Sequence, residues 1–102
     1  MFGMTTEDLR AVYEQLRDKY SLRWTTSSQL NEGFDGDFPV IVGKAHGQII
    51  ELYGADGDFV LDIMDEAQTK GTHFHPNNVA SAVADIAEFM DGKSDYPLFP
   101  FR

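Results

Sequence analysis

The sequence predicts an α+β domain, with an antiparallel sheet of about four strands and an N-terminal and a C-terminal helix packed on one face. Three apolar runs, Phe38–Val42, Ile49–Tyr53 and Phe59–Met64, are separated by short breaks that contain glycine. Breaks of about five residues favour antiparallel neighbours, because parallel pairing needs a crossover of a dozen residues or more. Helical periodicity lies on either side of this block, which separates helices from strands and indicates the α+β class.

The N-terminal helix is predicted to begin at Thr5, whose hydroxyl can cap the first turn, while residues 1–4 are expected to be flexible. Early acidic residues suit the positive end of the helix dipole. The apolar residues then recur at spacings of three and four, which places them on one stripe over about four turns. That stripe consists of Leu9, Val12, Tyr13, Leu16 and Tyr20.

The segment 21–28 changes to a two-residue period, which predicts a strand with Trp24 facing inward. A turn-rich loop, 31–37, leads into the three apolar runs, which we interpret as a meander. On the third run the side-chain alternation places Asp62 on the face opposite the core, together with Val60 and Met64. The core-facing residues of that run are Phe59, Leu61 and Ile63.

The strand pattern of the apolar runs ends before 69–72, which we interpret as a break. Pro76 and the asparagines at 77–78 then predict the start of a second helix. Its apolar stripe runs from Val79 to Met90, and Gly92 is expected to end it in a left-handed conformation. The tail, 93–102, is expected to pack back as an extended strip, because its prolines exclude a helix. The whole chain, 1–102, is expected to form one domain. Both helices should cover one sheet face and leave the other available to a partner.

The charge balance limits the class of partner. Seventeen Asp and Glu oppose eight Lys and Arg, for a formal net charge of −9. Nucleic-acid binding and anionic membrane surfaces are not expected, since both need a basic face. No apolar run approaches the ~20 residues of a membrane span, and no signal peptide is apparent. Cysteine is absent, which excludes disulfides and suits a cytoplasmic location. An acidic protein favours a basic partner.

A metal site is a weaker alternative. His73 and His75 are two residues apart in an extended segment, so they point to the same side, and imidazole pairs bind zinc, copper or nickel. His46 lies elsewhere, in the first meander turn, and no spacing nominates a third ligand. The Asp-Gly-Asp triplets at 35–37 and 56–58 resemble fragments of a calcium loop, but the EF-hand register fails and turn chemistry explains them. No cofactor is therefore expected.

Catalysis has no recognisable signature. The nucleophile motifs GxSxG and SxxK, the phosphate loops and HExxH are all absent. Seventeen acids will form pairs at useful distances by chance, and nothing selects two of them. We therefore do not expect an enzyme, although a small metal-dependent or acid–base enzyme using His73, His75 and nearby carboxylates stays open as an alternative.

The segment HFHPNNVASAVADIAEFMDG, residues 73–92, is similar to the final helix of small bacterial α+β proteins of unassigned function. As a compact, acidic, cysteine-free α+β chain, the protein also resembles the immunity proteins of bacterial toxin systems. That resemblance implies a cytoplasmic inhibitor which binds and blocks a cognate toxin. It carries over no functional residue.

These observations together predict a non-catalytic acidic domain that binds a basic protein, with an immunity-type inhibitor of a toxin as the specific form. A structural homodimer is a separate alternative. The free protein is expected to be a monomer or a homodimer. Its partner surface is expected to use acids in the loops and strands of the meander, with aromatic anchors among them. The predicted partner-binding residues are Glu32, Phe34, Asp35, Asp37, Tyr53, Asp56, Asp58, Asp62 and Asp65.

Overall fold

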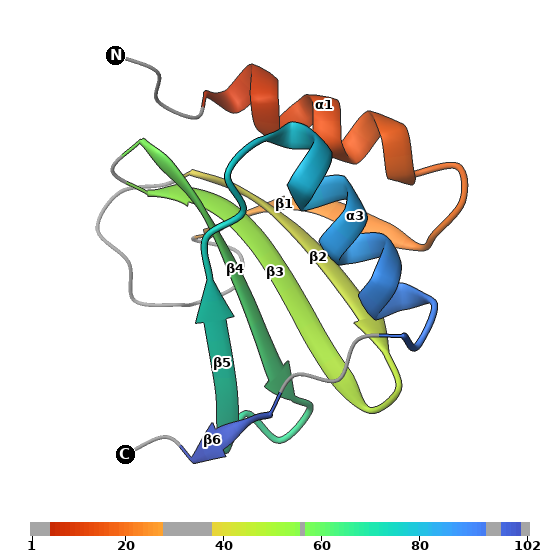
Figure 1. Cartoon of the computed structure of the whole chain (residues 1–102), viewed down its shortest axis with the longest axis vertical. Helices are drawn as coiled ribbons and strands as arrows, with labels where there is room; N and C mark the ends of the chain where they lie inside the picture. Colours follow the sequence, from red (N-terminus) through yellow and green to blue (C-terminus); the bar gives the residue numbers. More distant parts are fainter. Residues whose placement is uncertain (1–4, 28–37, 56, 94–96, 101–102) are drawn as a thin grey trace.

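The computed structural model describes residues 5–27, 38–55, 57–93 and 97–100. Within these ranges the strands form a single antiparallel sheet whose spatial order follows the sequence, so the fold is α+β with a meander, as predicted (Figure 1). The sheet has six strands where the sequence predicted about four. The strands are β1 (Leu22–Thr26), β2 (Pro39–Ala45), β3 (Gln48–Ala55), β4 (Asp58–Asp65), β5 (Lys70–Phe74) and β6 (Phe99–Pro100).

The two additional strands come from segments that the sequence assigned to a break and to the tail. β5 pairs with β4, with Leu61 opposite Phe74. In β6, Phe99 lies opposite Gly71 on β5, so this part of the tail adds an extended strip to the edge of the sheet. A proline is tolerated in β6 because an edge strand needs no N–H on its outer side. Phe99 is 60% exposed, so the strip is held by backbone pairing more than by burial of its ring.

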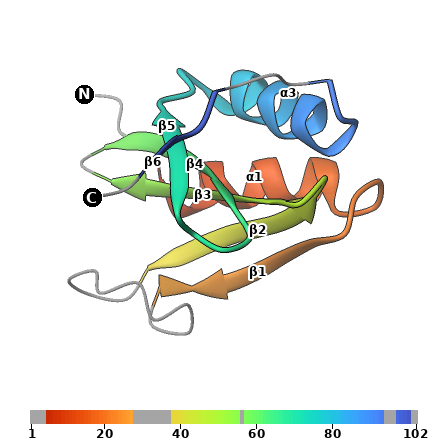
Figure 2. The ribbon, with the colours of Figure 1, turned by 90° about the horizontal axis from the view of Figure 1, so that it is seen from below.

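Both helices, α1 (Thr6–Leu16) and α3 (Val79–Met90), lie on the same side of the sheet (Figure 2). The predicted start of α1 is confirmed: the Thr5 hydroxyl accepts a hydrogen bond from the N–H of Asp8, and the Asp8 carboxylate accepts one from the N–H of Thr5. This reciprocal capping satisfies two otherwise unpaired donors. α1 ends at Leu16, about one turn earlier than predicted, so Tyr20 lies beyond it.

The ends of α3 are also as predicted. The Asn78 side chain accepts a hydrogen bond from the N–H of Ser81 and caps the helix. At the other end, Gly92 has φ +75° and its N–H bonds to the Phe89 carbonyl, while the N–H of Lys93 bonds to the Glu88 carbonyl. This pair of bonds is a Schellman motif, which requires the left-handed backbone that glycine adopts most easily. In the described ranges neither helix is long and apolar enough to cross a membrane.

The main core lies between the helices and the sheet. The alternation predicted for β4 is confirmed, because Phe59 and Leu61 are fully buried and Ile63 is 2% exposed. From the helices, Val12 and Ala82 are also fully buried. Each large apolar side chain buried in this way contributes roughly 1.5–3 kcal/mol to folding. Trp24 is partly buried against this core, as predicted, and its ring centre lies 5.5 Å from that of Tyr13.

The first hairpin is tied to the end of α3 by His46. His46 and Gly47 both have positive φ, 57° and 74°, which is the geometry of a two-residue type I′ turn between β2 and β3. The His46 ring then reaches the C-terminus of α3, where its Nε2 lies 3.3 Å from the Met90 carbonyl oxygen. This histidine therefore has a structural contact at the negative end of the helix.

Candidate functional site

The face of the sheet opposite α1 and α3, which we call the helix-free face, carries a second apolar cluster. The cluster does not form an open apolar surface, since each of its members is at most 9% exposed. The helix-free face is thus less available to a partner than the sequence suggested, and its accessible groups are polar. The cluster contains Val40, Val42, Ile49, Tyr53, Val60 and Met64, with Phe38 packed against it.

A transverse row of ionisable residues crosses the helix-free face. The register places Glu51 on β3 opposite Asp62 on β4, and Asp62 opposite His73 on β5. Side chains directly opposite one another in antiparallel strands have Cβ atoms about 4.5–5.5 Å apart. Glu51 is 5% exposed and Asp62 is half-buried. The strand order therefore brings two carboxylates and one imidazole into neighbouring positions.

Asp62 is held by Tyr53. The Tyr53 hydroxyl donates a hydrogen bond of 3.1 Å to Oδ2 of Asp62, and the Tyr53 ring packs 5.5 Å from the ring of Phe38. Burial raises the pKa of the Asp62 carboxyl above its usual value, while the Tyr53 hydrogen bond and the nearby His73 and His75 act in the opposite direction. The environment of Asp62 thus combines desolvation with a donor that favours the carboxylate.

His73 and His75 lie together beside Asp62. As the sequence predicted, the two histidines are on the same side of their extended segment. Their ring centres are 5.9 Å apart. The Nδ1 atom of His75 lies 3.0 Å from the carbonyl oxygen of Phe59. A carbonyl only accepts, so this hydrogen bond places the proton of His75 on Nδ1. Both side chains are otherwise exposed.

Several predicted binding residues lie outside the described residues: Glu32, Phe34, Asp35, Asp37 and Asp56. Tyr53 is described and is 8% exposed, so it is a buried support for Asp62 instead of an exposed aromatic anchor. Asp65 stabilises the turn between β4 and β5, because its carboxylate accepts hydrogen bonds from the N–H and hydroxyl of Thr69 and from the N–H of Lys70. Asp58 is exposed at the start of β4.

Negative charge is unevenly distributed over the described chain. The ranges 5–27 and 38–55 hold five acids and five bases, whereas 57–93 and 97–100 hold seven acids and two lysines. Three of the bases in the first group lie over aromatic rings: Arg10 over Trp24, Arg17 over Tyr13 and Lys19 over Tyr20, at 4.6, 5.6 and 5.8 Å. Among the described residues, the acidic excess is therefore in β4, the turn that follows it, and α3 with its C-terminal cap.

Few of the described acids form an ion pair with a described cation. Between described residues, the ion pair within 4 Å is Arg17 with Glu14, at 3.3 Å on the surface of α1. Asp58, at the start of β4, and Glu66, directly after its end, make no hydrogen bond or ion pair through their carboxylates with another described residue. The sequence did not single out Glu51, which belongs to the transverse row. The available signal was its position on β3 two residues before Tyr53, which places both side chains on the same face.

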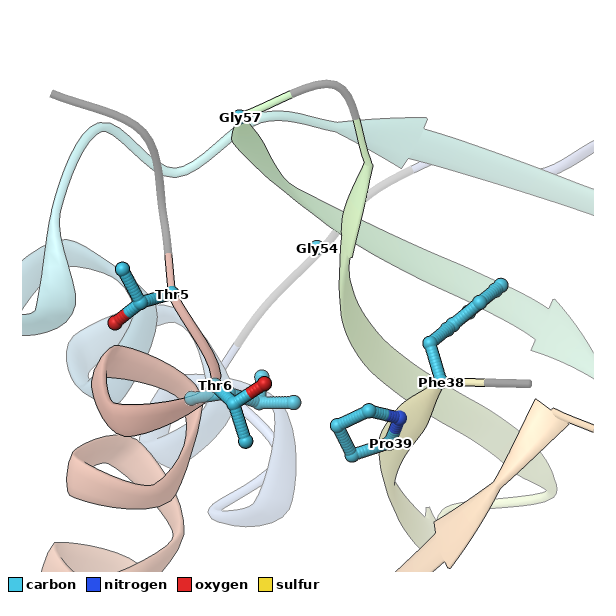
Figure 3. Close-up of a pocket in the computed structure, with 7 residues that line it drawn as sticks. Thr5, Thr6, Phe38, Pro39, Gly54 and Gly57 are labelled. Atoms are coloured by element: carbon cyan, nitrogen blue, oxygen red, sulfur yellow. The ribbon is translucent and has the colours of Figure 1, made fainter. Parts of the chain in front are cut away.

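Two cavities flank this part of the sheet. One, of about 330 Å³, lies at the end of β4 and the start of β5, and its lining includes Asp62, Gln68 and His73. The other, of about 150 Å³, lies between the start of α1, the start of β2 and the β3–β4 hairpin (Figure 3). Its described lining has no titratable side chain, which makes it a poor candidate for acid–base chemistry. That lining is Thr5, Thr6, Leu9, Phe38, Pro39, Gly54 and Gly57.

Within the described ranges no group of three or more His, Cys, Asp or Glu side chains is arranged to hold a metal ion. Comparisons of the chain with protein-family models, with curated proteins and with solved structures find no match. The function must therefore be argued from the charges and contacts of the chain itself.

Proposed function

We propose that this chain is a non-catalytic domain that binds a basic protein through the acids of its helix-free face. The observation that carries the proposal is a row of carboxylates along β4 and in the residue that follows it. Asp58, Asp62 and Glu66 occupy alternate positions with the buried Val60 and Met64, which directs all three acids to one face.

The spacing of these acids suits an extended contact. With a rise of about 3.3 Å per residue, Asp58 and Asp62 lie roughly 13 Å apart, and Glu66 continues the row by the same interval. The backbone keeps this register beyond the strand, because the N–H of Glu66 bonds to the carbonyl of Gly47. A row of this length can meet several cations of one partner.

The apolar residues between the acids give the row a rigid support. Val60 and Met64 are 9% and 8% exposed, so the strand is fixed by packing on both faces. Charges held on a rigid element lose little backbone freedom on binding, and complementary fields accelerate encounter and fix orientation. The favoured form of this function is an immunity-type inhibitor of a basic toxin in the bacterial cytoplasm. Its carboxylates would stand in for the phosphates that a nuclease recognises.

The experiment begins with the basic protein that co-purifies with the native chain from its host at low salt. Its affinity for the wild-type chain is then measured by calorimetry at two salt concentrations. The double variant Asp58→Asn/Glu66→Gln should weaken binding by about tenfold, or 1.4 kcal/mol. It should also lower the dependence of binding on salt, because both acids are exposed.

A matched control removes the same amount of charge from the helix side of the molecule. Glu14→Gln/Glu88→Gln neutralises two exposed helical acids, and the loss of the exposed Glu14–Arg17 pair costs little. This control should bind within about twofold of wild type. If both double variants weaken binding equally, net charge alone is responsible and the assignment of the helix-free face is wrong.

A further inference from the structure

We propose that His73 and His75 form a two-imidazole site for a divalent transition metal of the copper, nickel or zinc class, with water in the remaining coordination positions. This proposal is independent of the function proposed above. It does not require a third protein ligand, which the described ranges do not supply.

The state of His75 is the first argument. Its Nδ1–H donates to the Phe59 carbonyl, at 3.0 Å, which leaves the lone pair of Nε2 directed away from the backbone. Metal-binding histidines commonly donate their other ring N–H to a backbone carbonyl or carboxylate, since this fixes the tautomer and the ring orientation. His75 has that arrangement without a metal.

The separation of the rings is the second argument. Bonds of about 2.1 Å from one ion to two imidazole nitrogens place the ring centres roughly 5–6 Å apart at tetrahedral to wider angles. The rings of His73 and His75 are 5.9 Å apart, and their planes are inclined by 82°. His73 is exposed, so its ring can turn a nitrogen toward the ion without disturbing the core.

The charge around the pair is the third argument. Asp62, opposite His73 in the β4–β5 register, is electrostatically coupled to both imidazoles. Its carboxylate can accept hydrogen bonds from water on the ion and offset the positive charge. On the other side of Asp62 in the transverse row is Glu51, a second acid. On β5, the residue that precedes His73 on the same face is Gly71, which carries no charge.

The ligand set indicates which metals should bind. Imidazole suits copper, nickel and zinc, whereas magnesium and calcium prefer oxygen ligands. For a site of given ligands, affinity rises from nickel to copper and falls again at zinc. The site should therefore bind Cu²⁺ most tightly, Ni²⁺ and Zn²⁺ more weakly, and Mg²⁺ not at all.

The test uses the full chain without a histidine tag and titrates CuCl₂, NiCl₂, ZnCl₂ and MgCl₂ by calorimetry, with NMR spectra of the imidazoles recorded in parallel for Ni²⁺ and Zn²⁺. His73→Gln and His75→Gln should each weaken Ni²⁺ and Zn²⁺ binding by at least about tenfold. Asp62→Asn should weaken it by a smaller factor. His46→Gln is the matched control, because it removes the remaining histidine of the chain, and its affinity should stay within about twofold of wild type.

Because His75 also bonds to the backbone, its variant can lose stability, and the exposed His73 therefore gives the deciding comparison. Binding at one equivalent that His73→Gln removes and His46→Gln retains supports the site. Absence of binding in the wild type, or equal affinities in wild type and His73→Gln, overturns it.

Discussion

Replacing Tyr53 with phenylalanine removes the hydrogen bond that supports Asp62. The ring of Tyr53 is 8% exposed and packs on Phe38, so the substitution keeps the apolar contact and removes the hydroxyl. A hydrogen bond to a charged group is worth about 1.5–3 kcal/mol when buried, and the half-exposed Asp62 lowers that expectation to about 1–2 kcal/mol near neutral pH. The free energy of unfolding should fall by that amount.

The pH dependence of this loss has a definite sign. The pKa of Asp62 is raised in the folded state, so ionisation of this group weakens the fold as pH rises through the folded-state pKa. Without the Tyr53 donor the pKa rises further, and the destabilisation grows with pH. At about pH 3.5, where the carboxyl is largely protonated, the loss should be only about 0.5–1 kcal/mol, as for a neutral hydrogen bond.

Urea denaturation followed by Trp24 fluorescence measures the loss at both pH values, and NMR titration of the Asp62 carboxyl measures its pKa. Tyr13→Phe is the matched control, because the hydroxyl of this half-buried tyrosine makes no hydrogen bond to a described residue. Its loss should be small and independent of pH. A Tyr53→Phe loss that is the same at both pH values, or an unchanged Asp62 pKa, would refute the reasoning.

Three further predictions concern the scaffold. Gly43→Ala should lower the free energy of unfolding, measured by urea denaturation, by about 1 kcal/mol, because the added Cβ would lie 2.7 Å from a methyl of Leu22 and 3.2 Å from a methyl of the buried Ile50, and both side chains must shift. Gly92→Ala should lower the melting temperature, since φ is +75° and the Cβ would meet the His46 ring at 3.0 Å; an unchanged temperature would contradict the Schellman assignment. Hydrogen bonds within the β4–β5 turn, the one from the Thr69 hydroxyl first, lower the pKa of the Asp65 carboxyl. The Asp65 carboxylate therefore stabilises the fold at pH values above its unfolded-state pKa, and this stabilisation is lost as pH falls through its folded-state pKa. The urea midpoint of Asp65→Asn should therefore lie below that of wild type near neutral pH and converge with it in acid.

Much of the fold follows from local patterns. The caps at Thr5 and Asn78 and the glycine at position 92 are short-range signals, and the structure confirms each of them. The alternation along 59–64 assigned each side chain to the correct face, because the two-residue period depends only on the strand being a strand.

The missing strands reflect interactions that local patterns do not contain. β5 includes Gly71 and Thr72, where the sequence pattern predicted a break between elements. This segment is a strand because its backbone pairs with that of β4. Without β5 the sequence could not place His73 beside Asp62, although it did place the two histidines on one side. The burial of Tyr53 was missed for the same reason, since it depends on packing across the helix-free face.

The most direct test of the proposed binding function is an NMR titration of the labelled chain with its purified basic partner. The proposal predicts that amide shifts on addition of the partner concentrate on β4 and the adjoining positions of β3 and β5, and that the exposed surfaces of α1 and α3 stay unchanged. Shifts confined to the helices, with β4 unaffected, would contradict the claim that the acids of the helix-free face form the binding surface.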